Sequence, residues 1–347
     1  MQADTFNKLT SPLANKIEVN GKQFLYFGGT AYLGIPQNEA FFQLYLKGLK
    51  LFGINNGTSR SNNVQLGIYD DAEAHASEKF GAPAALITSS GYLAAQLVVK
   101  SLSNYGEVRY APATHPALWY HQTPQVSGSF TNWAKNIVEE INNSEKQNWV
   151  IITNSMNNLF PEIYDFSFVN ELNKKIYLIV DDSHGIGINN HGLGVFKTIP
   201  QCENVEVLVI ASMAKALGVD AGLILGSAKI INKLKQSDEF LGASPPAAAA
   251  LYAFMNAEKI YESELDILHE NMHLLNQQLN ADTNWHFISN FPVYLAKNAD
   301  LSRQLFENDI TVSSFAYPDK NGPVINRIVL SSWHTKKDIE QLIKAIK

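Results

Sequence analysis

Residues 177–187 read Tyr-Leu-Ile-Val-Asp-Asp-Ser-His-Gly-Ile-Gly. The apolar run has the length and composition of a buried strand, and polar residues follow directly where that strand should end. An Asp in this place, three residues before a His, can hold a cationic ring nitrogen while the imidazole packs beside it. The same Asp can instead cap the next turn. Asp181 and His184 are therefore candidate functional residues.

A second segment of this kind, residues 209–218, reads Val-Ile-Ala-Ser-Met-Ala-Lys-Ala-Leu-Gly. Lys215 follows the end of an apolar run, which is an unusual place for a surface charge. Partial burial lowers the pKa of a lysine and leaves a neutral amine that can form a Schiff base. The alternatives are a solvated loop lysine, or a serine hydrolase that uses Ser212 and Lys215. The hydrolase would leave Asp181 without a role, and its accompanying motifs are not apparent.

The third segment, Thr88-Ser89-Ser90-Gly91-Tyr92, stands where a strand should pass into a helix. Small residues there leave backbone N–H groups open to a phosphate, although Ser and Gly are also ordinary helix caps. A phosphate-binding segment, an Asp for a pyridinium nitrogen and a Lys for an aldehyde together indicate pyridoxal 5′-phosphate (PLP) as the cofactor.

The rest of the chain alternates short apolar runs with helical patterns. The runs at 84–89, 107–111, 149–153, 177–182, 205–211 and 222–226 predict an α/β fold with a mainly parallel sheet between helices. In such sheets the functional site forms at the carboxyl ends of the strands. A long helical stretch over 247–279 then leads into further strand-like runs. We expect an N-terminal segment (1–35), a large PLP-binding domain (36–244) and a small C-terminal α/β domain (245–347).

Composition excludes several classes of protein. The 347 residues are 46% hydrophobic and only 17% charged, so the chain can bury a large core and is not disordered. With 27 basic against 33 acidic residues and no basic cluster, nucleic-acid binding has little electrostatic support. Cys202 is the only cysteine, which excludes an internal disulfide framework and a cysteine metal cage. With neither a signal peptide nor an apolar membrane span, we expect a cytoplasmic enzyme.

At these motifs the sequence resembles the α-oxoamine synthase family of fold-type I PLP-dependent transferases. The similarity runs from about residue 32 to the C-terminus. The similar segments are Tyr32-Leu-Gly-Ile35, Gly57-Thr-Ser-Arg60, Ser90-Gly91-Tyr92, Ala113-Thr-His115, Asp181-Asp-Ser-His184-Gly185, Ser212-x-x-Lys215, Ser244-Pro-Pro246, and Arg327 with His334 seven residues later.

The resemblance implies roles around the cofactor ring. By the match, Lys215 carries PLP as a Schiff base and Asp181 pairs with the pyridine nitrogen. His184 should lie near the phenolic oxygen, and His115 should stack on the ring. All four are expected catalytic residues.

The same resemblance implies roles for the phosphate and for the substrate. Ser90, Gly91, Tyr92 and Ser212 match the phosphate-binding segments, and Ser244 matches a segment that contributes across a homodimer. Arg327 aligns with the arginine that binds the substrate carboxylate. A guanidinium fork suits that group because it can bind both oxygens.

Two departures from the family pattern concern the substrate. Thr30-Ala31 stands where the family has Asn before its Tyr-Leu-Gly motif, and Asn158 occupies a usual serine position. We therefore count Thr30 and Asn158 among the expected substrate contacts and leave the identity of both substrates open.

The implied activity is the condensation of an amino acid with an acyl-CoA or other acyl thioester, with loss of CO2. A class I/II aminotransferase would use the same residues and is the enzymatic alternative. A regulatory protein that only binds the cofactor would have no chemical need for Lys215.

Overall fold

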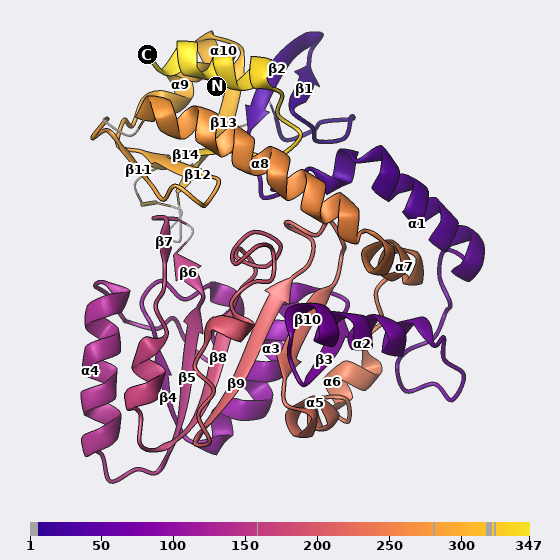
Figure 1. Cartoon of the computed structure of the whole chain (residues 1–347), viewed down its shortest axis with the longest axis vertical. Coiled ribbons are helices and arrows are strands. Elements are labelled where there is room, and N and C mark those ends of the chain that lie inside the picture. The colour runs from indigo at the N-terminus through magenta and orange to yellow at the C-terminus, as the bar shows by residue number, and fades with distance from the viewer. Residues whose placement is uncertain (1–5, 158, 280–281, 317–320, 323) are drawn as a thin grey trace. The chain divides into compact units, whose positions relative to one another are not determined.

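The computed structural model describes residues 6–157, 159–279, 282–316, 321–322 and 324–347. The chain divides into two compact units (Figure 1). Unit 1 comprises Met1–Phe42, Asn158–Glu162 and Lys259–Lys347, and unit 2 comprises Gln43–Asn157 and Ile163–Glu258. The chain changes unit after residues 42, 157, 162 and 258, whereas its sequence predicts boundaries after residues 35 and 244.

Unit 2 is built on a six-stranded sheet with the order β3-β10-β9-β8-β5-β4. Neighbouring strands from β9 to β4 are parallel, which confirms the mainly parallel sheet. β10 is antiparallel to both of its neighbours. For the pair with β9 the reason is local, because residues 213–221 are too short a connection for the crossover of a parallel pair. The strands are β3 (Ala84–Thr88), β4 (Glu107–Tyr110), β5 (Asn148–Asn154), β8 (Lys175–Asp181), β9 (Val205–Ser212) and β10 (Gly222–Gly226).

The middle of this sheet is buried on both faces. On β9, Leu208 and Ile210 share one core cluster with the helix α3, while Val207 and Val209 are also buried. Alternate residues of a strand point to opposite faces, so an uninterrupted apolar run is what a doubly covered strand requires. The helices that lie mainly in this unit are α1 (Glu39–Phe52), α2 (Ile68–Phe80), α3 (Gly91–Leu102), α4 (Phe130–Asn143), α5 (Ala228–Leu234), α6 (Asp238–Gly242) and α7 (Ala248–Asn256). A two-stranded ribbon is formed by β6 (Met156–Asn157) and β7 (Glu162–Ile163).

Unit 1 contains a second six-stranded sheet, with the order β1-β2-β13-β14-β12-β11. A hairpin with positive φ angles at Asn20 and Gly21 joins its first two strands, and β2 runs parallel to β13. Strands from both ends of the chain therefore share one sheet. The elements are β1 (Lys16–Val19), β2 (Lys22–Phe27), β11 (Trp285–Phe287), β12 (Val293–Ala296), β13 (Ile310–Ala316), β14 (Val324–Val329), α8 (Glu258–Leu279), α9 (Leu301–Glu307) and α10 (Lys336–Ile346).

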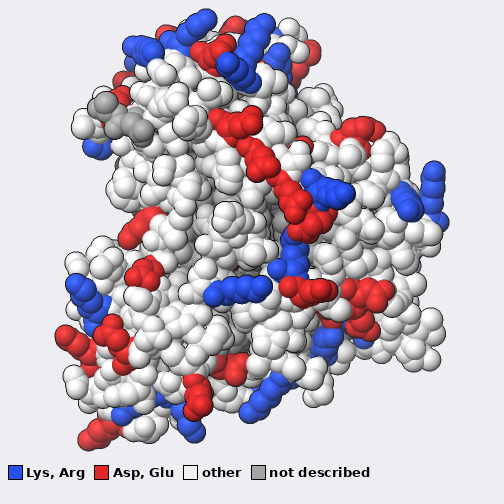
Figure 2. Space-filling model, viewed as in Figure 1, with Lys and Arg blue, Asp and Glu red and all other residues white. Residues whose placement is uncertain are grey.

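The helical stretch expected over 247–279 forms two helices, α7 and α8, which meet at Ala257. Acidic side chains gather along α8, while much of the surrounding surface is uncharged (Figure 2). None of the described helices combines the length and the apolar character needed to cross a membrane.

Candidate active site

Asp181 is the last residue of β8, and its surroundings fix the direction of its carboxylate. The backbone N–H of Ser183 donates to Asp181 Oδ1 over 2.8 Å. The Asp181 carbonyl accepts from the N–H of Ser155, which follows β5. The carboxylate therefore lies at the carboxyl end of the parallel strands, where the sequence placed it.

Lys215 and His184 meet at the same end of the sheet. The Nζ of Lys215 lies 2.8 Å from Nε2 of His184, and both side chains are half-buried. Lys215 reaches this place because it sits in the tight loop between β9 and β10. A second bond joins the two strand ends, since the Ser212 N–H donates to Ser183 Oγ over 2.8 Å.

His115 is close enough to this cluster for its charge to matter. Burial lowers the pKa of His115, the Asp181 carboxylate opposes that shift, and Lys215 adds to it. The ring accepts the Ala117 N–H at Nδ1 over 3.1 Å, so a neutral ring carries its hydrogen on Nε2. His115 is thus a neutral imidazole beside Asp181 and Lys215 at neutral pH.

Asn154 holds His115 in place and is not among the site residues expected from the sequence. Its Oδ1 accepts the His115 N–H over 3.1 Å, and its Nδ2 donates to the Ala113 carbonyl over 2.7 Å. Asn154 ends β5 directly beside Asp181 in the sheet register. A polar residue at the end of a second buried strand was the signal that could have identified it.

The expected phosphate segment lies against the end of β9. A Cβ at Gly91 would come within 2.6 Å of the Cβ of Ser212, so only glycine allows this approach of α3 to the strand. Ser90 caps α3 by accepting the Leu93 N–H at its Oγ over 3.1 Å. The Tyr92 side chain is 64% exposed. The structure thereby brings the Ser90–Gly91 helix start against Ser212.

Asp182 is a buried carboxyl group that organises the loop after β8. It is 1% exposed, and its Oδ2 accepts the Val195 N–H over 2.8 Å. A Cβ at Gly185 or at Gly194 would come within 2.2 or 2.3 Å of its oxygens, so the loop closes tightly around it. Burial raises the pKa of Asp182 to about 7. The second Asp of the motif therefore shapes the segment that carries His184.

The expected substrate residues fall in a different unit. Arg327 lies on β14 of unit 1, is 5% exposed, and packs its guanidinium over the Phe315 ring at 5.3 Å. Burial lowers the pKa of Arg327, and the electrostatic interaction with Tyr32 opposes that shift. Thr30 also belongs to unit 1 and is half-buried. Asn158 lies outside the described residues.

Ser244 lines a pocket of about 410 Å³ in unit 2, between the loop after α1 and the start of α7. Residues 54–59 and 244–248 form most of its wall. The residues around Lys215 are not among those that line it. Within this chain, Ser244 therefore lies beside the loop after α1 and is not part of the cluster around Lys215.

A model of the aminotransferase class I and II family matches residues 50–346. The chain belongs to this family. The 8-amino-7-oxononanoate synthase of Petrotoga mobilis is 26% identical, in a match that covers 97% of this chain and 91% of that protein. The match confirms the resemblance to the α-oxoamine synthases.

Solved structures place this aminotransferase-family chain in fold-type I. The serine palmitoyltransferase of Sphingomonas wittichii superposes with a TM-score of 0.81 at 16% identity, over 99% of this chain and 91% of that one. The 8-amino-7-oxononanoate synthase of Francisella tularensis gives 0.70 at 18% identity, over 93% of this chain and 96% of that one. The predicted fold is confirmed, and the chain is a PLP-dependent transferase of the class I and II family.

The described residues of this family member fit PLP. The start of α3 offers backbone N–H groups next to Ser212 for a phosphate. Because Gly91 has no Cβ, the helix start can lie directly against Ser212. A primary amine, Lys215 Nζ, and a carboxylate, Asp181, lie at the ends of neighbouring strands. The neutral ring of His115 interacts electrostatically with both. Among the described residues, no group of His, Cys, Asp or Glu is arranged to hold a metal ion.

Proposed function

We propose that this enzyme condenses an amino acid with an acyl thioester such as acyl-CoA and releases CO2, in the manner of an 8-amino-7-oxononanoate synthase. The observation that carries the proposal is the cluster of Lys215, His184, Asp181 and His115. It occurs in a chain that matches such a synthase over 91% of the synthase's length.

In this reaction the amino acid loses the proton on Cα, and a carbon–carbon bond forms between Cα and the acyl carbonyl carbon. The thioester C–S bond breaks, and the sulfur leaves as a thiol after taking up a proton. The bond from Cα to the carboxylate then breaks, CO2 leaves, and a proton returns to Cα. PLP supplies an electron sink for the negative charge at Cα in these steps.

The side chains of unit 2 have distinct roles in this scheme. Lys215 would supply the amine that holds the cofactor aldehyde. Once the substrate amine has displaced it, its free Nζ would move the proton at the substrate Cα. His184, 2.8 Å from Nζ, orients that amine. Asp181 keeps a proton on the pyridine nitrogen, which maintains the electron sink. The neutral ring of His115 would pack against the cofactor ring.

Arg327 is proposed to bind the substrate α-carboxylate, with Thr30 and Asn158 as further substrate contacts. A planar guanidinium that is already held over Phe315 binds a carboxylate with little loss of side-chain freedom. We also propose that the enzyme is a homodimer in which Ser244 contributes to the partner's cofactor site, in line with the resemblance of the 244–246 segment.

The test is thiol release from acyl-CoA esters. Purified protein is incubated with glycine, alanine or serine, each with a panel of acyl-CoA esters. We expect at least one pair to release thiol only when the amino acid is present. Lys215→Ala should lower that rate by on the order of 10³, because it removes the proton-transferring amine. Lys229→Ala, at an exposed position on α5, is the matched control.

A different result would identify the aminotransferase alternative. In that case no pair releases thiol, the amino acid alone converts bound PLP to its amine form, and a keto acid reverses the conversion. Absorbance spectra of the bound cofactor distinguish the two forms.

A further inference from the structure

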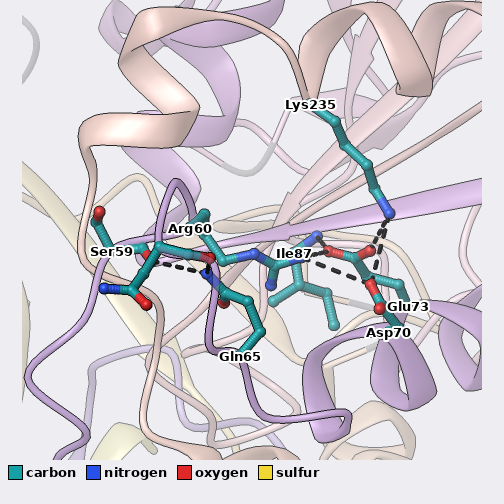
Figure 3. Close-up of polar contacts among 8 residues, drawn as sticks. Ser59, Arg60, Gln65, Asp70, Glu73, Ile87 and Lys235 are labelled. Atoms are coloured by element: carbon teal, nitrogen blue, oxygen red, sulfur yellow. Dashed lines mark hydrogen bonds and ion pairs between the residues drawn. The ribbon is translucent and has the colours of Figure 1, made fainter.

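The loop between α1 and α2, residues 53–67, is braced by its own side chains. Gln65 Nε2 donates to the carbonyl oxygens of Ser59 and Asn62 over 3.0 and 2.7 Å (Figure 3). Arg60 differs from most of this loop because its side chain is only 9% exposed. Arg60 is therefore a buried link between the loop and the rest of unit 2.

Glu73 of α2 receives that guanidinium, together with two other groups. Its Oε1 lies 3.2 Å from Arg60 Nη2 and also accepts the backbone N–H of Ile87 over 3.2 Å. Its Oε2 lies 2.6 Å from Nζ of Lys235. The Glu73 side chain is 4% exposed, so one buried carboxylate joins the loop, β3 and the end of α5 (Figure 3).

The charges of this network balance. Asp70 lies at its exposed rim, 3.8 Å from Arg60 Nη2 and 3.9 Å from Lys235 Nζ, so two cations face two carboxylates. The Arg60 guanidinium also lies over the rings of Tyr69 and Phe240, at 4.9 and 5.1 Å. Removing one member of a buried network leaves an uncompensated charge, whereas removing an opposite pair does not.

The network is connected to the cofactor site through β3. This strand is at the edge of the sheet, and the Ile87 N–H that Glu73 binds is three residues before Ser90. Beyond Ile87 the strand passes into the Ser90–Gly91 start of α3, which packs on Ser212. A shift of Glu73 would therefore move both the loop and the segment that precedes the phosphate-binding residues.

We propose that Glu73 is a positioning residue that holds both loop 53–67 and the end of β3. In this way it preorganises the Ser90–Gly91 part of the PLP site. The proposal rests on the assignment of Ser90–Gly91 as the phosphate-binding segment. It does not depend on which amino acid or thioester the enzyme uses. Arg60 fixes only the loop and not β3, because the Ile87 N–H is bound by Glu73 and not by Arg60.

The experiment compares Glu73→Gln, Arg60→Met and the control Asp71→Asn, an exposed carboxylate on the same helix. Two quantities are measured on the full-length protein: the PLP dissociation constant, and the rate of hydrogen exchange at the backbone amides of loop 53–67 and of β3. Glu73→Gln should weaken PLP binding by roughly tenfold to a hundredfold, because the phosphate-binding segment loses its support. It should also speed exchange in both segments.

Arg60→Met should speed exchange in the loop only and weaken PLP binding less than Glu73→Gln does, because Glu73 still holds Ile87 and the end of β3. The proposal is overturned if Glu73→Gln binds PLP as tightly as Asp71→Asn, whatever its thermal stability. Should Glu73→Gln not fold, the double variant Glu73→Gln/Lys235→Met is measured in its place. It removes one charge of each sign from the network. The same loss of affinity is expected, and parental affinity would again overturn the proposal.

Discussion

His334 is a buried histidine whose protonation opposes folding. Its side chain is 2% exposed, its Nε2–H donates to the Tyr26 carbonyl over 2.9 Å, and its Nδ1 accepts the Ser331 N–H over 2.9 Å. Burial lowers the pKa of His334 from 6.5 to about 4. Between these two values the unfolded chain binds the proton and the folded protein does not. The stability that depends on the neutral ring is therefore present above about pH 6.5 and lost as the pH falls toward 4.

From pH 7.5 to pH 5 we expect His334 to remove about 2 kcal/mol from the free energy of unfolding. His334→Gln lacks this titration, so the stability difference between parent and variant should shrink by that amount at pH 5. Urea denaturation at both pH values measures it, with the exposed His273→Gln as control. An unchanged difference between the two pH values would contradict the assignment.

At the scale of elements, the junction between α3 and β9 depends on a missing side chain. A Cβ at Gly91 would stand 2.6 Å from Cβ and 2.7 Å from Cα of Ser212. The preceding carbonyl of Ser90 has little room to retreat, because a Cβ at Gly222 would already lie 2.1 Å from it. The helix start and the strand end are therefore held at close contact from two sides.

Gly91→Ala should move the start of α3 away from Ser212, weaken PLP binding, and cost about 1–3 kcal/mol through overpacking. PLP titration and denaturant unfolding measure the two effects. Gly242→Ala, which would meet nothing within 4 Å, is the control with the same added methyl group. If Gly91→Ala binds PLP like Gly242→Ala, this junction does not contribute to the phosphate site.

At the scale of the whole molecule, the last turn of α1 and the loop after it present apolar side chains to solvent. Leu51, Ile54 and Val64 are 59%, 85% and 70% exposed. Several exposed apolar side chains on one segment favour an interaction surface. Together with the resemblance of Ser244 to a segment that contributes across a homodimer, they support the proposed homodimer.

We expect the protein to have the mass of a dimer by light scattering at micromolar concentration. Ile54→Glu places a charge in the apolar surface and should give a monomer with weakened PLP binding, whereas Val126→Glu, in the loop before α4, should remain dimeric. A parent protein that is monomeric and still holds PLP would count decisively against the interface.

The chemistry of the site could be predicted from sequence because each residue follows a local pattern. Asp181 ends one buried apolar run, Lys215 lies three residues after another, and Ser90 precedes a helix. Strand ends and helix starts are encoded within a few neighbouring residues, so their polar residues stand out without knowledge of the fold. The expected cofactor and fold class depended on these positions.

Only the tertiary structure determined the partners that hold these residues. The bonds from Asn154 to His115, from Ser183 to Ser212, and from Glu73 to Ile87 join segments that are far apart in sequence. Their pairing follows from strand order and from the closing of the sheet, which no local pattern encodes. The same holds for the hairpin of β1 and β2, which joins a sheet made mostly of C-terminal strands. Local periodicity specifies an element, whereas long-range packing selects the neighbours of that element.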